Sequence, residues 1–242
     1  MLKIQNIVKH FDGVKALDGL TLEIERGEIT ALIGPNGSGK TTLFSVISNL
    51  SRKNSGHIYL NKEETGKKED YEIAKEYISR TFQEVRLFRN LTIKDHLEIA
   101  LSENDENLLK SIFQKETDKT ERIREILDLV GLKKPLDAVA TDLSCGQRKL
   151  LDLAVAIAKS HQLLMLDEPV AGVNPHLRKE IKKILKKLNK EGETILIIEH
   201  DMNFIMDLAD KIYVLDRGKV IASGRPREIQ NNKKVLEAYL GE

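Results

Sequence analysis

Apolar and polar positions in the N-terminal part of the chain follow patterns that predict strands and then a helix. Residues 21–25 alternate between apolar and polar side chains, whereas residues 28–33 and 56–60 form mostly apolar runs. Alternation with a period of two and short apolar runs are both typical of β-strands. A glycine-rich turn follows Ile33, and the apolar positions of residues 41–50 have helical spacing. We therefore expect a strand, a turn and a helix here.

The central region has a helical pattern instead. Residues 93–101 and 121–130 carry apolar side chains at helical spacing, with charged residues on the opposite side. Gly131 predicts the end of the second of these helices. The polar and charged residues 102–119 are expected to form a partly mobile connection. We interpret this region as a helical insertion within an α/β core.

Strand and helix patterns alternate again in the C-terminal part. The expected elements are strands over residues 163–167, 194–199 and 211–215, helices over residues 175–188 and 203–209, and one or two short helices in residues 226–240. Such alternation predicts a largely parallel sheet with helices on its faces.

Composition narrows the class of protein without revealing a function. The 242 residues include 39 Lys+Arg and 38 Asp+Glu, so the formal net charge is +1. This balance argues against binding to nucleic acid or anionic lipid by bulk electrostatics. No apolar run approaches the roughly 18–20 residues of a membrane-spanning helix, and we expect no secretory signal. Cys145 is the single cysteine, which excludes an intrachain disulfide and favours a reducing cytosol.

The turn after Ile33 has the sequence of a phosphate-binding loop. It fits the pattern G-x-x-x-x-G-K-[ST] at every fixed position from Gly34 to Thr41. Glycines let successive backbone N–H groups face the phosphates, and the following helix adds its positive N-terminal end. Lys40 is expected to reach the β- and γ-phosphates, and the Thr41 hydroxyl to bind Mg2+. The strand before the loop and the helix after it favour this interpretation over a chance match.

Two acidic residues, Asp167 and Glu168, end the apolar strand predicted at residues 163–167. The carboxyl end of a parallel strand is where α/β sheets bind ligands. Asp167 would hold Mg2+, directly or through water, and Glu168 would orient or deprotonate the attacking water. An acidic strand end that simply enters a turn would have the same sequence, and the phosphate loop favours the functional interpretation.

Together with five further motifs in a fixed order, these two sites make the sequence resemble the ATP-binding cassette (ABC) ATPases of membrane transporters. The resemblance covers essentially the whole chain. The matching positions are Phe11, the Walker A residues Gly34, Pro35, Asn36, Gly37, Ser38, Gly39, Lys40, Thr41 and Thr42, the Q-loop residue Gln83, the signature residues Leu143, Ser144, Cys145, Gly146 and Gln147, the Walker B residues Asp167 and Glu168, the D-loop residues 170–174, and the switch residue His200.

The resemblance implies a role for each of these residues. Phe11 would stack on adenine, although by itself it could be a core aromatic residue. Gln83 would contact Mg2+ and couple the site to the helical insertion, although alone it would be an ordinary exposed amide. His200 would contact the γ-phosphate, although a lone histidine is usually structural. The implied ligands of Mg2+ are Thr41, Gln83 and Asp167, and the implied catalytic residues are Glu168 and His200.

The signature residues Ser144 to Gln147 precede an apolar helical segment at residues 150–158, so they could offer a helix N-terminus to an anion. In the family that anion is the γ-phosphate bound by the opposite subunit of a head-to-tail homodimer or heterodimer. A plain helix N-cap at Ser144 uses the same geometry. Two positions depart from the family pattern, because Cys145 replaces the first signature glycine and Asn174 the usual D-loop aspartate.

Several segments look similar to the ATPases of branched-chain amino-acid importers. They are residues 81–92, 168–175, 199–202 and 237–242. ATPases for urea import or lipopolysaccharide export share parts of this pattern. Two further classes compete with a transporter subunit, namely a soluble ABC ATPase acting on nucleic acid and a regulatory nucleotide-binding protein without turnover. The single cassette favours transport, and Glu168 and His200 favour turnover.

The expected fold is an α/β P-loop ABC-ATPase core over residues 1–90 and 159–242, with an antiparallel β subdomain. A helical insertion subdomain over residues 91–158 would carry the signature motif. We expect an ATPase that uses ATP and Mg2+ and lies peripherally on the cytoplasmic face of the inner membrane. Its expected partners are a second ABC ATPase, integral-membrane permease subunits and, indirectly, an extracytoplasmic solute-binding protein, and nucleic acid is not among them.

Overall fold

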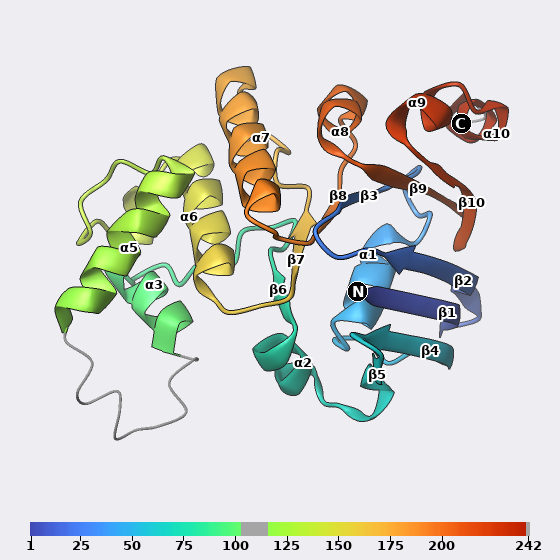
Figure 1. Cartoon of the computed structure of the whole chain (residues 1–242), viewed down its shortest axis with the longest axis horizontal. Helices are drawn as coiled ribbons and strands as arrows, with labels where there is room; N and C mark the ends of the chain where they lie inside the picture. Colours follow the sequence, from blue (N-terminus) through green and yellow to red (C-terminus); the bar gives the residue numbers. More distant parts are fainter. Residues whose placement is uncertain (103–115, 241–242) are drawn as a thin grey trace.

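A six-stranded, largely parallel sheet forms the centre of the computed structural model, which describes residues 1–102 and 116–240 (Figure 1). The strand order is β10-β9-β3-β8-β7-β6, in which β10 alone runs antiparallel to its neighbour. The strands are β3 (Ile29–Ile33), β6 (Ile78–Arg80), β7 (Leu163–Asp167), β8 (Ile195–Ile198), β9 (Lys211–Asp216) and β10 (Lys219–Gly224). The parallel sheet expected from the alternation of strands and helices is confirmed.

A second sheet is antiparallel and has the strand order β2-β1-β4-β5. Its strands are β1 (Leu2–Phe11), β2 (Val14–Ile24), β4 (Ser55–Leu60) and β5 (Glu63–Glu64). Helix α1 (Lys40–Ile47) shares a buried cluster with this sheet and with one face of the parallel sheet. The expected α/β core with an antiparallel β subdomain is therefore confirmed.

The helices α3, α5 and α6 contact one another and form a group at the far side of the molecule from β1 and β2 (Figure 1). Besides α1, the described helices are α2 (Asp70–Glu76), α3 (Ile93–Ser102), α5 (Glu116–Val130), α6 (Cys145–Ala158), α7 (Pro175–Lys190), α8 (Met202–Leu208), α9 (Pro226–Gln230) and α10 (Lys233–Leu240). Single 3-10 turns lie at Thr65–Lys67 and Ala140–Asp142. We propose residues 91 and 158 as the limits of this helical unit. Most of the expected connection at residues 102–119 lies outside the described residues.

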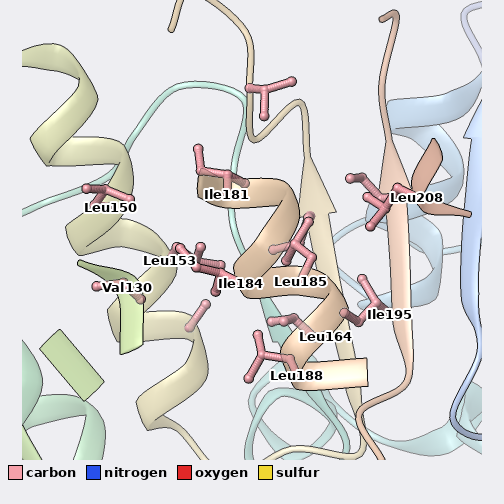
Figure 2. Packing of buried hydrophobic residues seen from close by; sticks show 14 of the residues in the cluster. Val130, Leu150, Leu153, Leu164, Ile181, Ile184, Leu185, Leu188, Ile195 and Leu208 are labelled. Atoms are coloured by element: carbon pink, nitrogen blue, oxygen red, sulfur yellow. The ribbon is translucent and has the colours of Figure 1, made fainter. Parts of the chain in front are cut away.

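Successive side chains of the central strands enter two different hydrophobic clusters, because they point to opposite faces of the sheet. Leu164 and Ile195 face the cluster built with α6 and α7, whereas Leu163 and Leu196 face the cluster that contains α1. Figure 2 shows α7 between α6 and the strands, with Leu185 and other apolar side chains directed at the sheet. A sheet buried on both faces explains why its strands appear in the sequence as apolar runs.

Several elements differ from the sequence-based expectations. Helix α5 begins at Glu116, so the last residues of the expected connection are helical. Helix α1 ends at Ile47 rather than at residue 50, and Asn49 beyond it has the left-handed φ of 55°. Helix α2 was not expected, because it buries only Ile73 and so lacks an apolar stripe. Strand β10 was also missed, since its residues are only partly buried and show no clear alternation.

Candidate active site

The backbone of the phosphate loop is closely packed and requires glycine at two positions. Gly34 has a φ of 148°, and a Cβ atom there would lie 2.0 Å from the carbonyl oxygen of Leu215. Gly39 has a φ of 105°, and its Cβ would lie 2.5 Å from the carbonyl oxygen of Ala16. Only glycine fits such positions without displacing backbone. The loop is therefore held in one shape between β3, which ends at Ile33, and α1.

Lys40 lies inside this loop at the first position of α1. Its ammonium group donates hydrogen bonds to the carbonyl oxygens of Gly34 (2.8 Å) and Pro35 (2.9 Å), and the residue is 6% exposed. A cation held at the N-terminal end of a helix, inside a loop with backbone close-packed around it, fits a phosphate group. Thr41, the next residue, is exposed on the first turn of α1.

Asp167 ends strand β7 and is almost completely buried. Its Oδ2 atom lies 3.3 Å from Nη2 of Arg80, and its backbone N–H donates to the Thr81 hydroxyl at 3.2 Å. Its other carboxylate oxygen, Oδ1, is buried and has no hydrogen-bond partner in the described chain. Burial raises the pKa of Asp167, and the neighbouring Arg80 opposes this shift. An unpaired buried carboxylate oxygen is costly, so a cation or its bound water is the partner that this position fits.

Gln83 and His200, which are distant from Glu168 in the sequence, both contact the Glu168 carboxylate. Its Oε1 atom lies 2.9 Å from Nε2 of His200, and Nε2 of Gln83 donates to its Oε2 atom at 3.2 Å. The backbone of Glu168 has a φ of 50°, which is unusual for a residue with a side chain. Gln83 follows β6, Glu168 follows β7 and His200 follows β8, so the common edge of the parallel strands brings them together.

Phe11 is 48% exposed, which excludes the alternative that it is a core aromatic residue. It ends β1 and pairs with Val14 across the β1–β2 turn. Ala16 of the same hairpin packs against Gly39, so this hairpin borders the phosphate loop. The ring is partly exposed, with the Lys9 ammonium group 4.6 Å from its centre, and a base that stacks on an aromatic residue needs such an exposed ring.

The signature segment forms the N-terminus of α6. Ser144 and Gln147 make reciprocal side-chain hydrogen bonds to each other's backbone N–H, which is a capping box, and Cys145 is the exposed first residue of the helix. This helix packs on the face of the sheet opposite to α1. The structure therefore does not unite the signature with the phosphate loop of the same chain in one cluster.

The two departures from the family pattern have local explanations. Asn174 is the N-cap of α7, where its Oδ1 atom accepts the backbone N–H of Leu177 at 2.9 Å. Asparagine and aspartate are both good N-caps, so the replacement keeps the helix start. Cys145 lies in a position where its side chain is exposed, whereas a Cβ at Gly146 would lie 2.7 Å from Leu177 Cδ2. Gly146, the signature glycine that this chain retains, is therefore the one whose added side chain would meet Leu177.

Two residues beside the Glu168 cluster, Glu199 and Lys149, make contacts that could not be foreseen from the motifs. Glu199, which is 3% exposed, accepts the backbone N–H groups of Val170 (2.9 Å) and His200 (3.1 Å). Burial raises the pKa of Glu199, and these hydrogen bonds oppose that shift. Lys149 of α6 donates to the carbonyl oxygen of Glu168 at 2.9 Å. For Glu199 the sequence signals were its place at the end of the apolar run 194–199 and in the segment 199–202, and neither indicated this contact.

We expect the Glu199→Gln variant to turn over ATP about tenfold more slowly, because an amide cannot accept both N–H groups and a lost charge-assisted hydrogen bond costs roughly 1.5–3 kcal/mol. Since Glu199 does not belong to the phosphate loop, the KM for ATP should stay within about twofold. Steady-state kinetics measure both values. Glu191→Gln, at an exposed position of the chain, is the control. Equal changes in kcat and KM, together with a lower melting temperature, would instead indicate a purely structural role.

The glycine-constrained loop and the acidic strand end beside it define a P-loop nucleotide hydrolase. The chain matches the ABC transporter family over residues 17–171 and therefore belongs to that family. A second match, to the family described as branched-chain amino acid ATP-binding cassette transporter, covers residues 219–242. The chain is accordingly an ATPase, the nucleotide-binding subunit of an ABC transporter. The predicted family is confirmed.

Relatives match along the full length of the chain. The probable branched-chain amino acid transport ATP-binding protein LivG of Archaeoglobus fulgidus is 38% identical over 100% of this chain and 95% of its own length. The high-affinity branched-chain amino acid transport ATP-binding protein LivG of Salmonella typhi is 36% identical over 100% and 98%. A solved nucleotide-free ATP-binding cassette from an ABC transporter superposes with a TM-score of 0.86 at 34% identity, over 100% of this chain and 99% of the other.

Proposed function

We propose that this chain provides the energy for the import of branched-chain amino acids, as a peripheral subunit on the cytoplasmic face of the cell membrane. The full-length relatives named for branched-chain amino acid transport and the C-terminal match over residues 219–242 support the substrate class. None of the helices in the described part of the chain is long and apolar enough to cross a membrane. Integral-membrane permease subunits would supply the path, and an extracytoplasmic binding protein would deliver the solute to them.

The cluster of Gln83, Glu168 and His200 is the observation that carries the hydrolytic part of this proposal. ATP would bind with its phosphates in the loop of Gly34 to Thr42 and its adenine against Phe11. The Glu168 carboxylate would accept a proton from the attacking water, since His200 and Gln83 fix its two oxygens. His200 would also donate toward the γ-phosphate, and Lys40 would balance charge on the phosphates.

The residues around the phosphate loop fit a Mg2+ ion. Asp167 has a buried Oδ1 atom without a partner among the described residues, and the Thr41 hydroxyl and the Gln83 amide oxygen are hard oxygen donors of the kind that Mg2+ prefers. These three residues would hold the ion together with phosphate oxygens. When bound, Mg2+ would neutralise charge that develops between the β- and γ-phosphates.

A second cassette would complete each site. The N-terminus of α6, with Ser144, Cys145, Gly146 and Gln147, would face the γ-phosphate of the partner chain, because α6 and α1 lie on opposite faces of the sheet. A solved bacterial ABC transporter cassette described as dimeric supports the presence of a second cassette; it has a TM-score of 0.85 at 27% identity over 94% of this chain and 99% of the other. The second cassette could be a copy of this chain or a related one.

A groove between α2 and the helices α3 and α6 offers the surface for a permease. Its cavity of about 380 Å³ is lined from the core side by Tyr71 and Phe82 and from the helical side by Phe88, Ile99 and Val155. Several large apolar side chains around it are exposed, namely Leu50 (52%), Tyr71 (67%), Phe88 (64%) and Ile99 (46%). An apolar patch of this kind is typical of a protein contact.

Polar groups hold the groove in shape and give it charge. The backbone N–H of Phe88 donates to Nε2 of buried His96 at 3.0 Å, which fixes the segment that presents the Phe88 ring. Arg80, Arg86 and Asp152 also line the cavity. Burial raises the pKa of Asp152 to about 7, against the opposing effect of Lys149. An amphipathic cytoplasmic helix of a permease, with apolar side chains and polar ends, fits such a groove.

We expect the Phe88→Ser variant to bind the permease more weakly while its ATPase activity is preserved. Removing a large, exposed aromatic side chain at the centre of an interface costs roughly 2–4 kcal/mol, which lowers affinity at least about tenfold. With permease and binding protein co-expressed, ATP-dependent uptake of leucine, isoleucine and valine should fall in proportion. The basal ATPase rate of the purified variant should remain within about twofold of the unmodified chain, since Phe88 lies outside the phosphate site.

Val14→Ser is the matched control, because Val14 is equally exposed (68%) but lies at the β1–β2 turn. It should leave uptake and co-purification with the permease unchanged. Uptake of urea instead of branched-chain amino acids by the unmodified transporter would overturn the substrate class. Stimulation of the ATPase by nucleic acid, without association with any permease, would overturn the transport function itself.

A further inference from the structure

Arg80, the last residue of β6, extends its side chain under the carboxyl end of β7. Strands β6 and β7 are parallel neighbours, with Arg80 in register with Met165, two residues before Asp167. The guanidinium Nη2 atom lies 3.3 Å from Asp167 Oδ2. The side chains of Arg80 and Asp167 are 7% and 2% exposed, so the ion pair is buried. None of the motifs in the sequence includes this arginine.

Three further groups fix the orientation of the Arg80 guanidinium. Its Nη1 atom donates to the Ser48 hydroxyl at 3.1 Å, just beyond the end of α1. The rings of Phe44 and Phe82 lie 5.4 Å and 4.9 Å from its central carbon atom. An arginine in contact with a carboxylate, a hydroxyl and two rings has little freedom to rotate.

The two carboxylate oxygens of Asp167 have different surroundings. Arg80 holds Oδ2, while Oδ1 is buried without a partner in the described chain. Thr81, the residue after Arg80, holds the backbone N–H of Asp167. Arg80 therefore orients the carboxylate, Thr81 anchors the backbone that carries it, and the oxygen without a partner in the described chain is the one left for a cation. Groups that orient a metal-binding side chain commonly change metal affinity when they are removed.

We propose that Arg80 is a positioning residue that orients Asp167 toward Mg2+ in the nucleotide site. This inference rests on the proposed role of Asp167 as a Mg2+ ligand. Arg80 also lines the groove proposed for the permease. One side chain thus borders both the metal site and the docking surface.

The test is the Mg2+ dependence of nucleotide binding, measured on the purified full chain without turnover. A fluorescent ADP analogue is bound at a series of Mg2+ concentrations and in EDTA. We expect Arg80→Leu to raise the Mg2+ concentration at half-saturation about tenfold, as is typical when a group that orients a metal ligand is removed. The affinity in EDTA should not change, because the phosphate loop is intact. Arg80→Lys, which can still reach Asp167, should recover part of the loss.

Arg86→Leu is the matched control, because Arg86 also lies over the Phe82 ring (4.0 Å) and lines the same cavity but has no contact with Asp167. It should leave the Mg2+ dependence unchanged. Should Arg80→Leu fail to fold, Ser48→Ala, which removes the second anchor of the guanidinium, should produce a smaller shift in the same direction. An unchanged Mg2+ dependence in the folded Arg80 variants, or in Arg80→Lys and Ser48→Ala, would overturn the proposal. The Asp167→Asn variant tests the proposed Mg2+ ligand separately, because it should shift the Mg2+ dependence whenever Asp167 is a ligand. A shift with Asp167→Asn but not with the Arg80 variants would overturn only the role of Arg80.

Discussion

The Glu168→Gln variant is expected to hydrolyse ATP roughly 100- to 10,000-fold more slowly than the unmodified chain, the contribution usual for a general base. Glutamine keeps the size of the side chain and can still contact His200 and Gln83, but it cannot take a proton from water. Binding of ATP should be preserved, since Lys40 and the phosphate loop are unaltered. Rate and affinity are measured by phosphate release and by equilibrium binding.

A chain that binds ATP without cleaving it should accumulate as an ATP-bound dimer. Light scattering coupled to size-exclusion chromatography should show this dimer with ATP and Mg2+, and monomer with ADP. Glu180→Gln is a suitable control, because Glu180 lies on the surface of α7 in an ion pair with Lys183. If Glu168→Gln remained monomeric with ATP, the composite-site mechanism would be wrong even if hydrolysis were lost.

Attachment of a bulky maleimide to Cys145 is expected to reduce the ATPase rate at least about tenfold. This thiol is exposed at the first residue of α6, between Ser144 and Gly146. In a closed dimer it would lie beside the γ-phosphate of the partner chain, where loss of preorganised anion contacts costs roughly 100-fold or more in rate. Because Cys145 is the single cysteine of the chain, one thiol accounts for all of the labelling.

Protection by nucleotide tests whether the closed dimer covers the Cys145 thiol. ATP and Mg2+ should slow the labelling of Cys145 in the Glu168→Gln chain, because the closed dimer covers the thiol, whereas ADP should not. The Cys145→Ser variant should remain active and become insensitive to maleimide, which excludes damage at other sites. Full turnover by a completely labelled chain would show that Cys145 faces away from the nucleotide.

Local patterns predicted the elements whose physical causes are local. The strand predicted at residues 163–167 corresponds residue for residue to β7, because a strand covered on both faces needs apolar side chains, here up to Leu166 before the acidic end at Asp167. The phosphate loop was predictable for a similar reason, since Gly34 and Gly39 meet backbone atoms at distances that no other residue tolerates. Helix α2 was missed because it is largely exposed, and strand β10 because its residues are only partly buried and show weak periodicity.

The contacts within the cluster around Glu168 could not be predicted from local patterns. Gln83, Glu168 and His200 were each predicted from a motif, but the motifs contain no distances between them. Their contacts at 2.9 Å and 3.2 Å arise because β6, β7 and β8 are neighbours in one parallel sheet. No role in the site was predicted for Glu199 or Arg80, although Glu199 belongs to the segment 199–202 that resembles the branched-chain amino-acid ATPases.

The sequence by itself therefore determined the class of protein and the phosphate loop, and it supplied the residues that we propose surround the nucleotide. The phosphate loop and the buried strands follow from backbone requirements and apolar patterns that each segment carries alone, whereas the class of protein and the other site residues follow from the ordered motifs that resemble the ABC family. The tertiary structure decided which groups share a hydrogen bond, and so which oxygen of Asp167 is held by Arg80 and which is left for a cation. The physical reason is that strand order in a parallel sheet depends on the packing of the whole core, and neighbouring strands need not be close in sequence.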